Sequence, residues 1–230
     1  MGSNNSSNYN VDIVMCIDAT GSMGGLIDKV KKNALSFYSD LSNSMAAKGK
    51  NISNLRVRLV AFRDYLADGK QAMLQTDFLN LPAQDIQYKN FLDSITAFGG
   101  GDEPEDGLEA LAYAIHNSKW TMDQGKHRHI IVVWTDAPTH PIGYGRSAPN
   151  YPPKMAANFD ELTEWWGDTD NPGFMPDQSA KRLLMFAPDA PYWNMVNENW
   201  DNNILYPSDA GNGMDETDYE SILDVIANSI

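Results

Sequence analysis

The chain has 230 residues, which is long enough for one sizeable α/β domain and short for two independent ones. Its 31 Asp and Glu residues outnumber its 17 Lys and Arg residues, which gives a formal net charge of −14. This charge argues against binding to nucleic acid or to an anionic membrane surface, and it suits cation binding. The one cysteine, Cys16, excludes an internal disulfide framework and a cysteine-rich zinc site, and no apolar run approaches the ~20 residues of a membrane span.

The first ten residues are rich in Gly, Ser and Asn and have neither the basic start nor the apolar stretch of a secretory signal. We expect residues 1–10 to form a flexible lead-in and residues 11–230 to form a single domain, with no insertion into a membrane. We therefore expect a cytoplasmic location, although a signal that had been removed from the sequence would leave an extracytoplasmic one open.

Hydrophobic patterning predicts strands that alternate with helices. Residues 11–17 are apolar and β-branched, which is typical of a buried strand, and apolar residues spaced three and four apart from Met23 to Leu41 predict a helix. In chain order, the predicted elements are a strand at 11–17, a helix at 23–45, strands at 55–62 and 77–81, a helix at 85–95, a helix that carries Leu108 to Ile115, a strand at 130–134, a helix at 159–166, a strand at 183–187, a helix at 192–200, a strand at 204–206 and a helix at 216–230.

Strands separated by helical stretches predict an α/β fold, doubly wound, with a mostly parallel central sheet and helices on both faces (a Rossmann-like arrangement). The continuous apolar character of strands 11–17, 130–134 and 183–187 agrees, because strands covered on both faces lose the alternating pattern. In such folds, ligands bind beyond the carboxyl ends of the strands. The residues after Ile17 and Trp134 are therefore the first candidates for a site.

Oxygen-bearing side chains follow both of these strands. Asp18, Thr20 and Ser22 come directly after the first strand, and Asp136 follows the strand at 130–134. A glycine-rich turn at 98–106 adds Asp102 and Glu105. One carboxylate and two hydroxyls at alternate positions of a turn form a set of hard oxygen ligands, which suits Mg²⁺ and does not suit zinc.

These motifs resemble the von Willebrand factor A domain and its metal-ion-dependent adhesion site. DATGSM matches the family's Asp-x-Ser/Thr-x-Ser element at Asp18, Thr20 and Ser22, and WTDAP supplies its later Asp at Asp136. The runs FRDY, GGGDEPED and DAPTHPIGY further resemble a subgroup found in bacterial proteins and in atypical α-kinases of lower eukaryotes. The resemblance implies a non-catalytic recognition module that binds Mg²⁺, with Mn²⁺ or Ca²⁺ as alternatives.

In this family, the aspartates often act through water while the hydroxyls bind the ion directly, and a partner protein supplies a carboxylate or another oxygen. The sequence departs from the family at Asp102, which stands where many relatives carry a loop threonine. With Asp18, Asp102 and Asp136 all charged, three negative charges and one divalent ion would leave the site at −1. Either Asp102 acts through water, or the site favours a neutral or water-mediated ligand. If Asp102→Thr left both Mg²⁺ affinity and partner binding unchanged, both alternatives would be contradicted.

Several of these residues also have ordinary structural interpretations. Thr20 or Ser22 would serve as a helix N-cap, and Glu105 would be a first-turn acid favoured by the helix dipole. The connection at 139–153 is long and loop-like, and such loops often carry function. We predict that it forms a recognition rim beside the metal. The candidate rim residues are Glu105, His140, Tyr144 and Arg146.

Two other functions stay open from the sequence. A Mg²⁺-dependent phosphotransferase or phosphatase of the haloacid dehalogenase type would place its nucleophile at Asp18, but such enzymes need a second Asp where Thr20 stands and a lysine after a later strand. A structural domain with a vestigial site is the other alternative. Calorimetry with Mg²⁺ and Mn²⁺ separates it from a metal-dependent binding module.

Overall fold

The computed structural model describes residues 7–101, 103–212, 214 and 218–230. Its strands form a seven-stranded sheet in the order β3-β2-β1-β5-β6-β7, with β4 paired to β2. The parallel strands are β1 (Ser7–Asp18), β2 (Lys50–Phe62), β5 (Lys126–Trp134), β6 (Lys181–Pro188) and β7 (Asn203–Ser208). The short strands β3 (Met73–Gln75) and β4 (Leu79–Leu81) run antiparallel to β2. The predicted mostly parallel sheet is confirmed.

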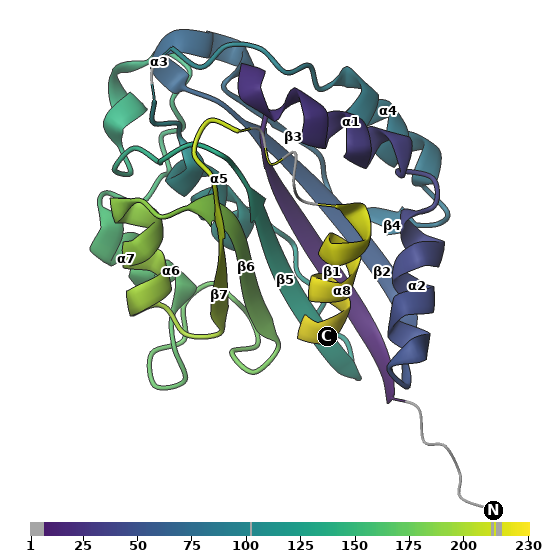
Figure 1. The fold of residues 1–230 in the computed structure, drawn as a ribbon. Helices are drawn as coiled ribbons and strands as arrows, with labels where there is room; N and C mark the ends of the chain where they lie inside the picture. Colours follow the sequence, from purple (N-terminus) through teal and green to yellow (C-terminus); the bar gives the residue numbers. More distant parts are fainter. Residues whose placement is uncertain (1–6, 102, 213, 215–217) are drawn as a thin grey trace, which may run out of the picture.

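Helices cover both faces of this sheet (Figure 1). They are α1 (Gly24–Lys32), α2 (Phe37–Ala47), α3 (Tyr65–Asp68), α4 (Asp85–Ser94), α5 (Gly107–His116), α6 (Phe159–Trp166), α7 (Pro191–Asn199) and α8 (Tyr219–Ser229). Alternate residues of β1 point to opposite sides, so Ile13 and Met15 pack with α1, α2, α4 and α8, whereas Val14 and Cys16 pack with α5, α6 and α7. Two apolar layers therefore hold the sheet between the helices.

The predicted helix at 23–45 is wrong as one element, because it is two helices with a break between Lys32 and Phe37. At the break, the Asn33 side-chain amide donates to the carbonyl of Lys29, and the Ser36 hydroxyl donates to the carbonyl of Asn33. Such side chains compete with the helical backbone for hydrogen bonds. The apolar stripe continues across the break because both helices still face the same core.

Other boundaries also differ from the sequence prediction. β1 begins at Ser7, so the part of the predicted lead-in from 7 to 10 is strand, held by pairing of Tyr9 with Ile52 and Lys126. The short edge strand predicted at 77–81 is confirmed as β4, two residues shorter, and β3 is an additional strand that was not predicted. The final helix begins at Tyr219, after the cap residue Asp218, and residues 215–217 lie outside the described part of the chain. No helix in the described ranges is both long and apolar enough to cross a membrane.

Candidate metal centre

Asp18 ends β1 and is fully buried. Its Oδ1 accepts hydrogen bonds from the Thr20 amide (2.9 Å) and the Thr20 hydroxyl (2.6 Å), and its Oδ2 accepts one from the Thr135 hydroxyl (2.7 Å). Burial raises the pKa of Asp18 to about 6, against the lowering effect of these hydrogen bonds. Asp18 is thereby fixed in place and sets the orientation of the Thr20 hydroxyl.

Ser22 and Asp136 come together from opposite halves of the sequence. The Ser22 hydroxyl donates to Asp136 Oδ1 at 2.9 Å. The capping interpretation of the hydroxyls is wrong, because the turn at Gly21–Met23 begins with Thr20 as cap residue and has no side-chain cap hydrogen bond. A hydroxyl that donates its proton to a carboxylate keeps its lone pairs free for a cation. Thr20 and Ser22 are both in this state.

The two hydroxyls open onto a hollow of about 390 Å³ at the carboxyl end of the sheet. Thr20, Ser22, Asp136, Glu103 and Glu105 line it together with glycine backbone and Ala137. Gly100 has a φ of +82°, and a Cβ there would lie 2.6 Å from Glu105 Oε1 and 3.2 Å from Thr20 Cγ2. The glycine-rich turn is therefore needed for the close approach of the backbone to the site.

Glu105 is the acid that the glycine turn places in this hollow. Its side chain is 3% exposed, and its Oε2 has no hydrogen-bond partner among the described residues. Burial, followed by the negative charges of Asp18, Asp64, Asp68 and Asp106, raises the pKa of Glu105 to about 9. The dipole interpretation of Glu105 is wrong, because α5 begins at Gly107 with Asp106 as its cap residue. Asp102, the candidate ligand in the same turn, lies outside the described residues.

The donor set fits a hard divalent cation. Carboxylate and hydroxyl oxygens are the ligands that Mg²⁺ prefers, and a buried carboxylate oxygen without a partner is satisfied by a cation beside it. Across the described residues, no three His, Cys, Asp or Glu side chains are grouped so that they would hold an ion by themselves. An ion at this hollow would therefore need the hydroxyls of Thr20 and Ser22.

Arg63 organises the loops around the hollow, a role that the sequence did not indicate. Its buried guanidinium donates to the carbonyls of Ala19, Gln71, Thr96 and Phe98. One side chain therefore ties the turn after β1 to the start of the glycine-rich turn. Its neighbour Asp64 makes turn bonds, accepting from the amides of Leu66 and Ala67 at the start of α3.

The connection after Asp136 lies at the same end of the sheet as the hollow. The Glu105 amide donates to the carbonyl of Pro138, the His140 amide donates to the carbonyl of Glu105, and the short helical turn Tyr144–Ser147 contacts α3. His140 is buried, with Nε2 3.2 Å from Asp64 Oδ2 and its ring stacked on Tyr144. It supports the loop from inside.

Two of the predicted rim residues are exposed. The Tyr144 side chain is 46% exposed, and exposed Arg146 donates to the carbonyls of Ala156 and Ala157. Tyr151, also in this loop, donates its hydroxyl to buried Glu109 Oε1 at 2.9 Å. The loop is thus anchored from within while Tyr144 and Arg146 face outward.

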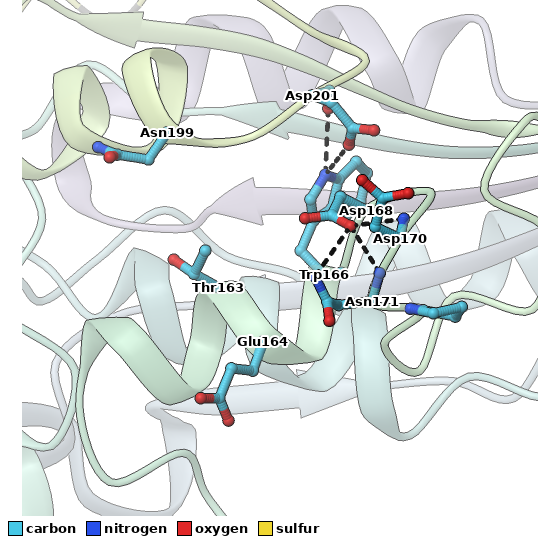
Figure 2. A pocket seen from close by; sticks show the side chains of 10 residues that line it. Thr163, Glu164, Trp166, Asp168, Asp170, Asn171, Asn199 and Asp201 are labelled. Carbon is cyan, nitrogen blue, oxygen red and sulfur yellow. Dashed lines mark hydrogen bonds between the residues drawn. The ribbon is translucent and has the colours of Figure 1, made fainter.

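A larger hollow, of about 730 Å³, lies elsewhere and is acidic (Figure 2). Its carboxylates include Asp168, which accepts from the amides of Asp170 and Asn171, and Asp201, which pairs with buried Lys181 at 2.7 Å and accepts from the Trp166 indole. These carboxylates serve the local structure of the loop after α6. None of the motif residues after β1 and β5 lines this hollow.

Residues 12–142 match the family model of the von Willebrand factor A domain. This match covers more than half of the chain, which therefore belongs to the von Willebrand factor A domain family. The matched segment contains Asp18, Thr20, Ser22, Glu105 and Asp136.

The chain is similar to parts of longer proteins. It is 24% identical over 143 residues to alpha-protein kinase vwkA of Dictyostelium discoideum, a match that covers 62% of this chain and 21% of the kinase. The chain therefore spans about a fifth of the length of this curated relative.

Solved structures resemble the fold over 97% of the chain. Proximal thread matrix protein 1 from the mussel byssus has a TM-score of 0.51 at 11% identity, with 49% of its chain covered. The pilus adhesin SpaC from Lactobacillus rhamnosus GG has a TM-score of 0.49 at 14% identity, with 31% of its chain covered. At these identities, the likeness to the mussel protein concerns the fold alone.

Proposed function

We propose that this domain is a divalent-metal-dependent protein-binding module that has no catalytic step. The observation that carries the proposal is the convergence of Thr20, Ser22 and Asp136 on one hollow, where the Ser22 hydroxyl donates to Asp136 Oδ1 across 114 positions of sequence. This hydrogen bond joins the two motifs that follow β1 and β5.

In this proposal, Thr20 and Ser22 bind the ion directly through their hydroxyl oxygens. Asp18 and Asp136 accept the hydroxyl protons and balance the positive charge. Glu105 is the third oxygen ligand beside the two hydroxyls, since its Oε2 is buried and has no partner among the described residues. When bound, Mg²⁺ would supply a coordination position for an oxygen of the partner, and Mn²⁺ or Ca²⁺ would substitute for it.

Three buried carboxyl groups, those of Asp18, Asp136 and Glu105, contribute charge at this site, and exposed Glu103 also lines the hollow. If all three were ionised around one divalent ion, the sum would be −1, and a partner carboxylate would be repelled. If Glu105 keeps its proton, the sum is zero. These three groups then no longer repel a partner carboxylate.

The surroundings of the hollow suit contact with a protein. Tyr144, Leu66 and Phe98 are each more than 40% exposed, at 46%, 48% and 41%. Tyr and Arg are frequent anchors at the centres of interfaces, and Tyr144 and Arg146 project from a loop that is anchored from inside. We propose that these side chains form the rim that a partner contacts around the metal.

Titration calorimetry with Mg²⁺ and Mn²⁺ tests the metal site. The proposal expects saturable binding of one ion and a higher melting temperature in the presence of metal, because a ligand that binds only the folded state stabilises it. Ser22→Ala abolishes both effects, whereas Ser39→Ala, on the exposed surface of α2, leaves them intact. If the wild type gives no heat and no thermal shift, the site is vestigial and the proposal fails.

A Mg²⁺-dependent phosphotransferase is the second candidate, and the relative from Dictyostelium is named as a kinase. That name applies to a protein of which this chain matches about a fifth. In this chain, Thr20, whose hydroxyl is bonded to Asp18, occupies the position of the second aspartate that a haloacid-dehalogenase-type enzyme needs. Turnover of a generic phosphatase substrate with Mg²⁺ that is lost in Asp18→Asn would overturn the binding-module proposal.

A further inference from the structure

A hollow of about 520 Å³ lies at the end of the sheet opposite the metal centre. It is lined by residues at the amino ends of the parallel strands and at the end of α8, which Figure 1 shows in front of β1 and β5. Three of these residues are cationic: Lys50 begins β2, Arg128 is the third residue of β5, and Arg182 is the second residue of β6. The hollow has no assigned role in the proposed function.

The lining of this hollow, called here the cationic hollow, contains no Asp or Glu. This is unusual in a chain with 31 acids and 17 bases, and the hollows at the metal centre, in Figure 2 and beside α8 are each lined by acids. In the part of the chain that the structure describes, no carboxylate forms an ion pair with Lys50, Arg128 or Arg182. Three positive charges therefore face one hollow that no Asp or Glu side chain lines, although the terminal carboxyl group of Ile230 also belongs to its lining.

Neutral groups hold these cations in place. Arg182 Nη1 donates to the carbonyls of Ser179 (2.9 Å) and Lys181 (2.6 Å), Arg128 Nη1 donates to the carbonyl of His127 (2.8 Å), and Lys50 Nζ donates to the carbonyl of Ala227 (3.3 Å). The guanidinium of Arg128 also lies 5.1 Å from the centre of the Tyr9 ring. Carbonyls and a ring orient the cations but do not neutralise them.

One guanidinium donor at this hollow stays unused. The Nε of Arg128 is buried without a hydrogen-bond partner among the described residues. A buried charged donor in this state costs free energy unless a ligand accepts from it. The arrangement therefore has both positive charge and a donor without a partner, which an anion would satisfy.

The sheet register forces the two arginines together. Arg182 pairs with Ile130, so Arg128 lies two residues along the neighbouring strand and points to the same face. Burial and then the charge of Arg128 lower the pKa of Arg182, while Asp177 and Asp201 act in the opposite direction from beyond ion-pair distance. An anion between the two guanidinium groups would relieve this repulsion.

We propose that the cationic hollow binds a phosphate-class oxyanion, as the free ion or as a phosphomonoester group, through Arg128, Arg182 and Lys50. Planar guanidinium groups bind phosphate oxygens through paired, charge-assisted hydrogen bonds, and a dianion balances two of the three positive charges. The net charge of −14 does not prevent this, because charges more than about 8 Å away are screened at physiological ionic strength. The charges in contact decide the ligand.

Titration calorimetry with inorganic phosphate tests this proposal on the whole chain, in chelator and at constant ionic strength, so that the metal centre takes no part. We expect saturable one-site binding that Arg128→Gln and Arg182→Gln each weaken by about tenfold or more. Lys154→Gln, an exposed residue with the same change of charge, is the matched control and should change the affinity by less than about twofold. Absence of saturable binding, or equal weakening by Lys154→Gln, contradicts the proposal.

Two further arms identify the ligand class and guard against misfolding. If phosphoserine binds more tightly than inorganic phosphate, the ligand is a phosphomonoester, and the reverse order indicates the free ion. Acetate that binds as tightly as either contradicts the phosphate class.

If a Gln variant loses its folded circular dichroism signal, Arg128→Lys replaces it. Because lysine keeps the positive charge, Arg128→Lys should lose less phosphate affinity than Arg128→Gln. An affinity equal to that of the wild type would show that the paired donors of the Arg128 guanidinium are not used.

Discussion

The two ends of the parallel sheet carry opposite chemistry. At the carboxyl ends of β1 and β5, Asp18 and Asp136 accept hydrogen bonds from Thr20 and Ser22, and buried Glu105 adds a third carboxyl. At the amino ends of the strands, Lys50, Arg128 and Arg182 face one hollow that no Asp or Glu side chain lines. The net charge of −14 does not predict which ligand binds at either end of the sheet, because ligand choice depends on the charges within a few ångströms.

Removing an acid from the carboxyl end should give the largest effect and should leave the other end unchanged. Asp136→Ala takes away the acceptor of the Ser22 hydroxyl, so we expect Mn²⁺ affinity to fall by up to about 100-fold. Asp28→Ala, an exposed acid on α1, should leave Mn²⁺ affinity unchanged. Calorimetry of both variants with Mn²⁺, and separately with phosphate, measures the two ends independently. Loss of phosphate binding in Asp136→Ala would show that the ends are coupled.

Glu105 should affect metal affinity and stability in opposite directions. Glu105→Gln removes a carboxyl group that would release its proton and bind the ion, and we expect Mg²⁺ affinity to fall by about tenfold. In chelator, the same variant should melt a few degrees higher, because it no longer places a buried carboxyl beside Asp18, Asp64 and Asp68. Thermal melts with and without Mg²⁺ show both effects. A variant that lowers the melting temperature in chelator would contradict this role of Glu105.

The pH dependence of metal-free stability follows from the same carboxyl. The pKa of Glu105 is raised from an ordinary value of 4.5 to about 9, so between these values the folded state binds the proton that the unfolded state releases. Stability therefore falls as pH rises through this range. In urea unfolding at several pH values, Glu105→Gln should reduce the slope, whereas Glu103→Gln, its exposed neighbour, should keep it.

The sequence predicted the parts of the site that local pattern determines. Asp18, Thr20 and Ser22 stand at fixed spacing after an apolar strand, and Asp136 follows another, so parallel pairing of the strands was enough to bring them together. The helix at 159–166 was confirmed for the same reason, since its apolar periodicity and its Asn158 cap are both local.

Tertiary contacts determine what the sequence could not show. The segment from Ser7 to Asn10 has one apolar residue, Tyr9, and becomes strand through backbone pairing with β2 throughout and with β5 from Tyr9 onward. The role of Arg63 depends on carbonyls from three separate loops. Lys50, Arg128 and Arg182 lie on three strands far apart in sequence, so only the sheet brings their charges to one hollow.

The smallest expected effect concerns the loop at 139–153, beside the proposed metal site. Tyr151→Phe removes the hydrogen bond to Glu109, and we expect a loss of about 1 kcal/mol in stability with faster amide exchange in the loop. Tyr144→Phe, at a residue 46% exposed, should change neither. Affinities for Mg²⁺ and phosphate should stay as in the wild type in both variants. A large loss of Mg²⁺ affinity in Tyr151→Phe would show that the loop shapes the metal site as well as its rim.

The central claim is that a divalent ion binds at the hydroxyls of Thr20 and Ser22. A crystal structure from crystals grown in Mn²⁺, with anomalous diffraction data, tests it most directly. The account predicts an anomalous peak within coordination distance of the Thr20 and Ser22 hydroxyl oxygens, in the hollow lined by Asp136 and Glu105. Anomalous peaks only elsewhere on the molecule, with the Ser22 hydroxyl still donating to Asp136 over an ion-free hollow, would contradict it.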